Sequence, residues 1–267
     1  MISDGHGDTA WQLIQSLNNP RIYEGLLEDC QVIDGDTNYR WPNIFVGYQS
    51  SGGVHILNYL RKNGELFLKL LADLPEEATV RSELKPVRKL ILNYVQLSDL
   101  DTLSKLTELT VLVLGSNQIA DVTLLKPLTQ LAELDLSYNQ ITDVMPLGDL
   151  TRLTKLDLSI NPITDLTPLK RLTQLTYLHL HRNQITDLTP LKGLPQLTGL
   201  KLGDNPTPDL TPLKGLPQLT MLDLIHNPIE DVSSLLQLTQ LKKLRIGGNN
   251  ISDYSRLAEL NNLQILD

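Results

Sequence analysis

A repeat of 22 residues is the feature that most constrains the fold of this chain of 267 residues. We number positions within each unit from its first apolar residue. The third unit shows the spacing L-x-x-L-x-L-x-x-N-x-I-x-D at Leu131, Leu134, Leu136, Asn139, Ile141 and Asp143. The units begin at Val87, Leu109, Leu131, Leu153, Leu175, Leu197, Leu219 and Leu241, and a partial ninth begins at Leu263. Self-similarity at this period predicts a stacked array of short units.

The physics of one unit explains its spacing. Leucines at positions 4 and 6 predict a short strand with one buried face, and such a strand must stack on neighbours to cover that face. The Asn column at position 9 is predicted to hydrogen-bond turn backbone. The Asp at position 13, often followed by Leu-Thr-Pro, predicts a short 3₁₀ or helical turn with the Thr as N-cap. We assign both columns structural roles, in preference to acid–base chemistry or calcium binding.

This unit, followed by x-x-P-L-x-x-L-x-x, resembles the class of leucine-rich repeats with 22 residues that occurs in bacterial internalins, and the resemblance covers about two thirds of the chain. It implies an α/β solenoid, with a curved parallel sheet, short 3₁₀ or irregular convex arms, and protein binding as the usual activity. Two units depart from the pattern, with Val95 in place of Asn and Thr207 in place of Ile. We expect a local irregularity at Thr207. Nothing after the repeats resembles the C-terminal sandwich or wall anchor of internalins.

The chain is predicted to have two parts. Residues 1–86 carry no repeat and are predicted to form a mainly helical cap, and residues 87–267 form the solenoid of eight repeats plus a partial ninth. Within the cap, Asp34–Asn38 resembles the start of a calcium loop but lacks its later Gly and Glu. Ser50–Gly53 lacks the Gly-Lys-Ser/Thr ending of a phosphate loop. We therefore predict no metal and no cofactor.

Composition excludes several classes of partner and site. A net charge of −8 argues against nucleic acid and anionic membranes as partners, because both require a basic face. A single cysteine excludes an internal disulfide and a thiolate zinc cluster. No apolar stretch is long enough to insert into a membrane. Since the first residues lack the layout of a secretion signal, we expect a cytoplasmic protein, or a secreted or surface-exposed one if a leader has been removed.

The concave face of the predicted sheet is the candidate binding surface. Side chains at positions 3 and 5 should face solvent there, with positions 7 and 8 at its edge. Large amphipathic side chains, which protein interfaces favour, gather at these positions. The predicted partner-binding residues are Tyr138, Asp157, Tyr177, His179, His181, Arg182, Lys201, Met221, Asp223, His226 and Arg245. The alternative is an ordinary strand surface that serves solubility and cross-strand pairing.

His179 and His181 lie two residues apart on one predicted strand, with Asp157 beside His179 on the next strand. A strand keeps such side chains parallel, whereas a metal site needs convergent ligands, so no metal is predicted. We predict instead a pairing of His179 with Asp157 that raises the histidine pKa and makes partner binding depend on pH.

The sequence thus predicts a monomeric module without catalytic residues that binds another protein. Two alternatives stay open. In the first, the repeats are the targeting or sensor part of a larger signalling or GTPase-type protein, with the activity in the N-terminal region or in a missing downstream domain. In the second, the role is structural, and the last repeat stacks on another copy of the chain.

Overall fold

A computed structural model describes residues 88–93, 97, 100–101, 103–260 and 263–266 of the chain. The chain divides between Lys85 and Pro86, and the fold described here belongs to the second part. The predicted helical cap over residues 1–86 lies outside the described residues, as does Val95.

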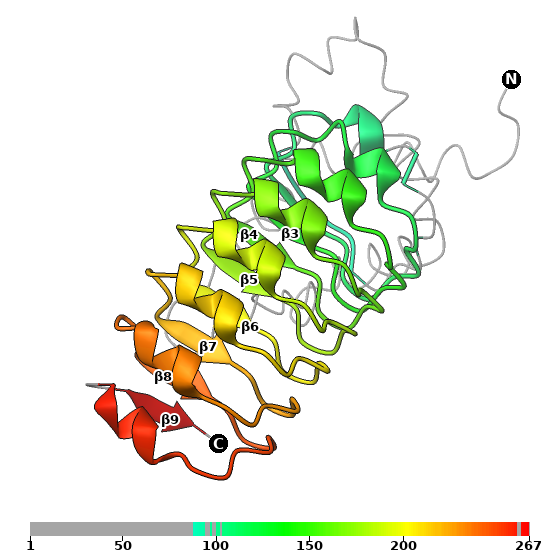
Figure 1. The fold of residues 1–267 in the computed structure, drawn as a ribbon. Coiled ribbons are helices and arrows are strands. Elements are labelled where there is room, and N and C mark those ends of the chain that lie inside the picture. Colours follow the sequence, from blue (N-terminus) through cyan, green and yellow to red (C-terminus); the bar gives the residue numbers. More distant parts are fainter. Residues whose placement is uncertain (1–87, 94–96, 98–99, 102, 261–262, 267) are drawn as a thin grey trace, which may run out of the picture. The chain divides into compact units, whose positions relative to one another are not determined.

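In the described part of the chain, nine strands form one parallel sheet in chain order (Figure 1). Each strand is laterally paired with the equivalent residues of the next unit; Leu134, for example, pairs with Leu156, which pairs with Leu178. The predicted solenoid is therefore confirmed. The strands are β1 (Lys89–Ile91), β2 (Val111–Val113), β3 (Glu133–Asp135), β4 (Lys155–Asp157), β5 (Tyr177–His179), β6 (Gly199–Lys201), β7 (Met221–Asp223), β8 (Lys243–Arg245) and β9 (Gln264–Leu266).

The last strand departs from the predicted period. Leu244 of β8 pairs with Ile265 of β9, whereas a unit that begins at Leu263 would pair it with Leu266. The ninth unit is therefore in register one residue earlier than the sequence pattern predicted.

Short 3₁₀ helices follow the strands and form a row on the opposite side of the stack from the sheet (Figure 1). None of the described helices is long and apolar enough to cross a membrane. The helices are η1 (Leu103–Lys105), η2 (Thr123–Leu125), η3 (Met145–Asp149), η4 (Thr167–Arg171), η5 (Thr189–Gly193), η6 (Thr211–Gly215), η7 (Ser233–Gln237) and η8 (Ser255–Glu259).

The carboxylates at position 13 accept a backbone N–H from the first residue of the 3₁₀ helix that follows. The N-cap role predicted for the threonines is therefore wrong. Thr167 is the first residue of η4 rather than its cap, and its N–H donates to Oδ1 of Asp165 at 2.7 Å. Hydrogen bonds from the hydroxyl and the N–H of Thr167 lower the pKa of Asp165, because they favour the ionised carboxylate. The same backbone bond is made by Asp121, Asp143, Asp187, Asp209, Asp231 and Asp253.

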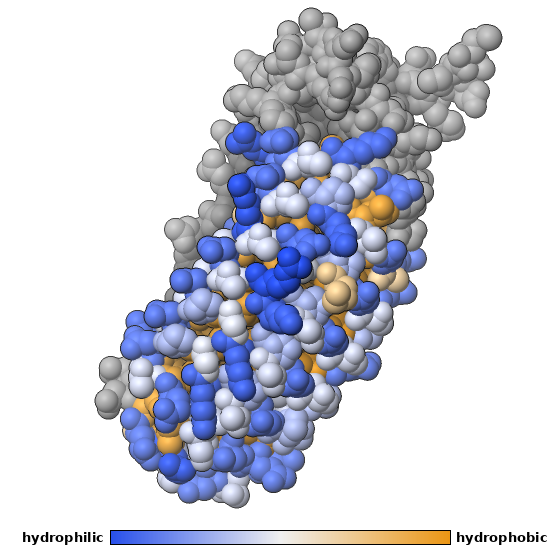
Figure 2. Space-filling view, turned by 45° about the horizontal axis from the view of Figure 1, so that its top comes forward, coloured by the Kyte–Doolittle hydropathy of each residue, from blue (hydrophilic) through white to orange (hydrophobic). Residues whose placement is uncertain are grey.

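The core is a set of aliphatic columns that run through the stack. Leu134, Leu136 and Ile141, together with their equivalents in the neighbouring units, are fully buried between the strands and the 3₁₀ helices. On the face of the described repeats that Figure 2 shows, the surface is mostly hydrophilic, with hydrophobic residues visible mainly in narrow bands. Apolar burial is thus completed by stacking, as expected for units too small to have a core of their own.

A ladder of asparagines satisfies the buried turn backbone. Oδ1 of Asn161 accepts the N–H of Ile141 in the preceding unit at 3.0 Å. Its Nδ2 donates to the carbonyl oxygens of Leu136 at 3.0 Å and Leu158 at 3.1 Å, so one amide joins two units. The structural role predicted for the Asn column is confirmed from Asn117 to Asn249.

Thr207 causes no irregularity in the strand register, contrary to the prediction, because β6 and β7 remain paired residue for residue. Its side chain is fully buried, and its hydroxyl donates to the carbonyl oxygen of Ile185 at 2.8 Å. In the preceding unit the carbonyl of Ile163 receives a backbone N–H from Gln184. Pro206 has no N–H to donate in the same way, and the Thr207 hydroxyl supplies the bond instead.

We predict that Asn161→Ala lowers the free energy of unfolding by about 3 kcal/mol, because it leaves several buried backbone groups without partners. Urea denaturation followed by circular dichroism measures the loss. Asn249→Ala is the matched control. Asn249 makes the same bonds in a half-buried setting, so water can replace part of what is lost and the decrease should be smaller. Equal losses in the two variants would contradict the ladder as the main polar constraint.

Candidate partner-binding surface

The strand face consists of the side chains at positions 3 and 5, which alternate with the buried leucine at position 4. Parallel pairing places equivalent side chains of neighbouring units beside each other. Row 3 holds Val111, Glu133, Lys155, Tyr177, Gly199, Met221 and Lys243, and row 5 holds Val113, Asp135, Asp157, His179, Lys201, Asp223 and Arg245.

Two charge pairs in row 5 join neighbouring strands. Nδ1 of His179 lies 2.8 Å from Oδ2 of Asp157, so the predicted pairing of these residues is present. Nη1 of Arg245 donates to Oδ2 of Asp223 at 2.9 Å. Both carboxylates are buried, and the second oxygen of each accepts an N–H from the turn that follows its strand. Asp157 and Asp223 therefore stabilise the sheet as well as lying on the candidate surface.

Asp135 differs from these carboxylates because no ion pair with a base is found for it among the described residues. Its neighbours in row 5 are Val113 and Asp157, and it is 6% exposed. Burial, followed by repulsion from Asp157, raises the pKa of Asp135 to about 6. Sequence reasoning missed this titrating group, although the shared position 5 of the two aspartates was a signal for it.

One edge of the Tyr177 ring lies against Gly199 of the next strand, and the side chain is buried. A Cβ on Gly199 would be 2.6 Å from Cδ2 of Tyr177, so the ring occupies the space that a side chain there would fill. Nζ of Lys201 lies 5.8 Å from the ring centroid, within the range of a cation–π contact. The tyrosine is consequently buried, and only part of its edge is available to a partner.

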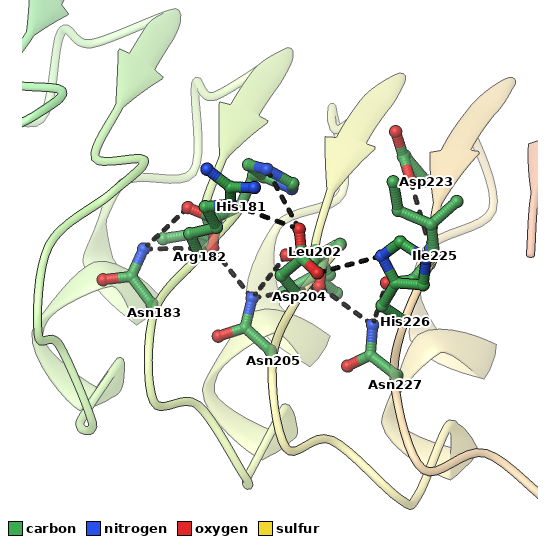
Figure 3. A network of polar contacts seen from close by, with 12 residues as sticks. His181, Arg182, Asn183, Leu202, Asp204, Asn205, Asp223, Ile225, His226 and Asn227 are labelled. Carbon is green, nitrogen blue, oxygen red and sulfur yellow. Dashed lines mark hydrogen bonds and ion pairs between the residues drawn. The ribbon is translucent and has the colours of Figure 1, made fainter. Parts of the chain in front are cut away.

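A polar cluster forms where the edge positions of three units meet (Figure 3). Asp204 lies at its centre, with Oδ2 at 3.2 Å from Nε2 of His181 and 3.4 Å from Nε of Arg182. Its Oδ1 lies 3.0 Å from Nδ1 of His226. Burial lowers the pKa of His181, which opposes the effect of the nearby carboxylate. Sequence reasoning selected the three basic residues but not the carboxylate that holds them together.

The predicted partner-binding residues fall into three groups by exposure. Tyr138, Arg182, His226 and Arg245 are exposed; His179, His181, Lys201 and Met221 are half-buried; Asp157, Tyr177 and Asp223 are buried. In the part of the chain that the structure describes, no group of three or more His, Cys, Asp or Glu side chains is arranged to hold a metal ion. The accessible surface is therefore weighted toward the edge of the strands rather than their centre.

Comparison with known proteins identifies the family. A family model described as leucine-rich repeats (two copies) matches residues 129–171, 173–215 and 217–261. The crystal structure of internalin C2 from Listeria monocytogenes is 35% identical, with a TM-score of 0.67, over 79% of this chain and 91% of that chain. The chain belongs to the internalin-like leucine-rich-repeat proteins.

Two further structures extend the likeness of this leucine-rich-repeat protein. A leucine-rich-repeat protein of Leptospira interrogans is 30% identical, with a TM-score of 0.64, over 69% of this chain and 50% of that chain. The ectodomain of the plant receptor kinase GASSHO1/SCHENGEN3 from Arabidopsis thaliana, in complex with Casparian strip integrity factor 2, is 27% identical, with a TM-score of 0.60, over 67% of this chain and 24% of that chain. No curated protein sequence matches the chain. The family model and the two bacterial structures name leucine-rich-repeat proteins and no enzyme.

We predict that Asp135→Asn raises the free energy of unfolding at pH 7.5 by about 2 kcal/mol, because the amide removes a buried like-charge repulsion. As pH rises from about 4 to about 6, the unfolded chain loses this proton while the folded chain retains it, so wild-type stability falls over that window. The advantage of the variant should therefore vanish near pH 4. Urea denaturation at both pH values measures it.

Asp223→Asn is the control, because Asp223 has a basic partner in Arg245 and its loss should destabilise the chain at pH 7.5. A variant Asp135→Asn whose advantage is the same at both pH values would show that the titration of Asp135 is not the cause.

Proposed function

We propose that this leucine-rich-repeat protein binds another protein, without catalysing a reaction, through the strand face and the adjoining edge positions. The observation that carries the proposal is the unbroken lateral register of β1 to β8, which aligns polar and aromatic side chains in continuous rows. Rows of this kind on a solenoid offer an extended surface, and repeat proteins use such surfaces to bind partners. The complex of the plant receptor ectodomain with Casparian strip integrity factor 2 supports the same use of this fold.

The group on the strand face that most resembles a catalytic triad is formed by Ser159, Asp157 and His179, and its geometry does not suit catalysis. Ser159 and His179 both contact Asp157, the hydroxyl at 2.6 Å from Oδ1 and the imidazole Nδ1 at 2.8 Å from Oδ2. A catalytic triad requires the histidine to lie between the serine and the carboxylate, so that the imidazole can accept the serine proton. Here the carboxylate lies between them, an arrangement suited to bracing the sheet.

We expect a monomer that binds no nucleic acid, and cytoplasmic localisation also stays a prediction. Binding should depend on side chains that face solvent and leave the core intact. Met221 and Lys243 meet this condition, because they are lateral neighbours in row 3 and are half-buried. Met145 on η3 and Lys192 on η5 are exposed on the opposite side and match them in residue type.

We predict that Met221→Arg/Lys243→Glu abolishes capture of the partner from a lysate of the source organism. Met145→Arg/Lys192→Glu makes the same changes of residue type and charge on the other side, and should retain the partner as the wild type does. Mass spectrometry of the captured proteins is the measurement, after circular dichroism shows that all three chains are folded.

Loss of the partner by the control variant alone would move the site to the side of the 3₁₀ helices. Retention by both variants would contradict binding through the strand face and leave the edge positions to be tested.

A further inference from the structure

A row of left-handed residues runs along the edge of the strand face. We call it the rim; it consists of the position 8 residues Ser116, Tyr138, Ile160, Arg182, Asp204 and His226. All six have φ between 52° and 57°. The eighth unit has Gly248 at this position, with φ of 70°.

The backbone of the rim, rather than its side chains, performs the structural task. The N–H of Tyr138 donates to the carbonyl of Ser159, and that of Ile160 donates to the carbonyl of His181, at 2.9 and 2.7 Å. Glycine adopts this conformation without steric cost, whereas a β-branched residue such as Ile160 is an outlier there. Gly248 has the same conformation in the eighth unit, so this position of the turn needs the left-handed backbone and not one particular side chain.

The rim changes character along the stack. Tyr138 is 55% exposed, and the half-buried Ile160 is its neighbour in the next unit. The following units present Arg182, with its side chain 61% exposed, and two units further His226, with its side chain 63% exposed. Tyr138 and Ile160 therefore form an apolar and aromatic part of the rim, whereas further along Arg182 and His226 flank Asp204.

Arg182 has more hydrogen-bond donors than the carboxylate of Asp204 uses. Asp204 faces three basic side chains, namely His181, Arg182 and His226. Arg182 reaches it through Nε at 3.4 Å, and no contact of its two terminal amino groups is found among the described residues. A guanidinium presents these two groups in a geometry that matches an incoming carboxylate. The exposed terminal amino groups of Arg182 thus favour a carboxylate of a ligand at this position.

We propose that the rim binds an extended segment of a partner protein, with an apolar or aromatic side chain on Tyr138 and Ile160 and a carboxylate on Arg182. This inference rests on the proposed function and names the chemistry of the partner. Tyr138 and Arg182 are two units apart, about 10 Å at the spacing of paired strands. An extended chain covers that distance in about three residues. The recognised pattern is therefore an apolar residue and an Asp or Glu about three positions apart.

A phage-displayed library of random eight-residue peptides, selected on the full chain, tests this pattern. Enriched peptides should carry it, and their synthetic versions should bind in a fluorescence anisotropy titration. Tyr138→Gly and Arg182→Gly should each weaken binding at least tenfold while the chain stays folded, because glycine suits the left-handed backbone. Arg182→Lys keeps the charge but loses the bidentate geometry, so it should weaken binding to an intermediate degree.

Arg171→Ala is the matched control. Arg171 is also 61% exposed and pairs with a carboxylate, Asp149, on the side of the 3₁₀ helices, so its loss should leave peptide binding unchanged. Enrichment of basic peptides, enrichment of no pattern, or equal binding by the rim variants would overturn the inference. Peptide binding lost only in Met221→Arg/Lys243→Glu would leave the proposed function standing without the rim. Binding that depends on the rim, together with partner capture that does not depend on the strand face, would sustain the rim alone.

Discussion

The asparagine ladder is the interaction on which the rest of this structure depends. Each amide binds backbone of its own turn and of the turn in the unit before it, as Asn139 does with the N–H of Ile119 and the carbonyl of Leu114. Water is excluded from these turns, so an amide displaced by one residue would leave buried donors and acceptors unpaired. The ladder therefore fixes the lateral register and turns a fixed separation in sequence into adjacency in space. Every row of side chains on the strand face and the rim inherits its order from this constraint.

Because neighbouring units are held in register, a charged side chain in one unit affects the side chain at the same position in the next unit. Side chains in row 5 cannot move away from the next strand, so a carboxylate is stabilised or destabilised by the residue at the same position one unit away. Asp157 gains His179 and Asp223 gains Arg245, and both carboxylates also hold the turn that follows them. Asp135 is buried beside an apolar neighbour and another aspartate, and burial followed by repulsion from Asp157 raises its pKa. Stability and surface charge are therefore coupled on this face, whereas the rim, where the turn needs no particular side chain, can vary independently.

This division of labour bears on recognition. The strand face is rigid and closely packed, with Tyr177 packed against Gly199 and several carboxylates committed to internal hydrogen bonds. On this face, many side chains are therefore already engaged in contacts and hydrogen bonds within the sheet, which leaves fewer groups for a partner. The rim presents the more exposed groups, among them Tyr138 and Arg182, on a backbone held equally firmly. A preorganised backbone with exposed side chains reduces the entropy lost on binding, which favours a short extended ligand.

The sequence by itself determined the architecture, because the requirement that sets it is local and repeated: the period fixes which leucines are buried, where each strand lies, and which asparagines form the ladder. It also placed His179 beside Asp157. The tertiary structure decided what those positions do. The left-handed rim, the burial of Tyr177 beside Gly199, the Asp204 cluster and the shifted β9 all escaped the pattern. The physical reason is that side-chain burial, dielectric environment and hydrogen-bond partners arise only when neighbouring units pack, and no spacing along one chain specifies them.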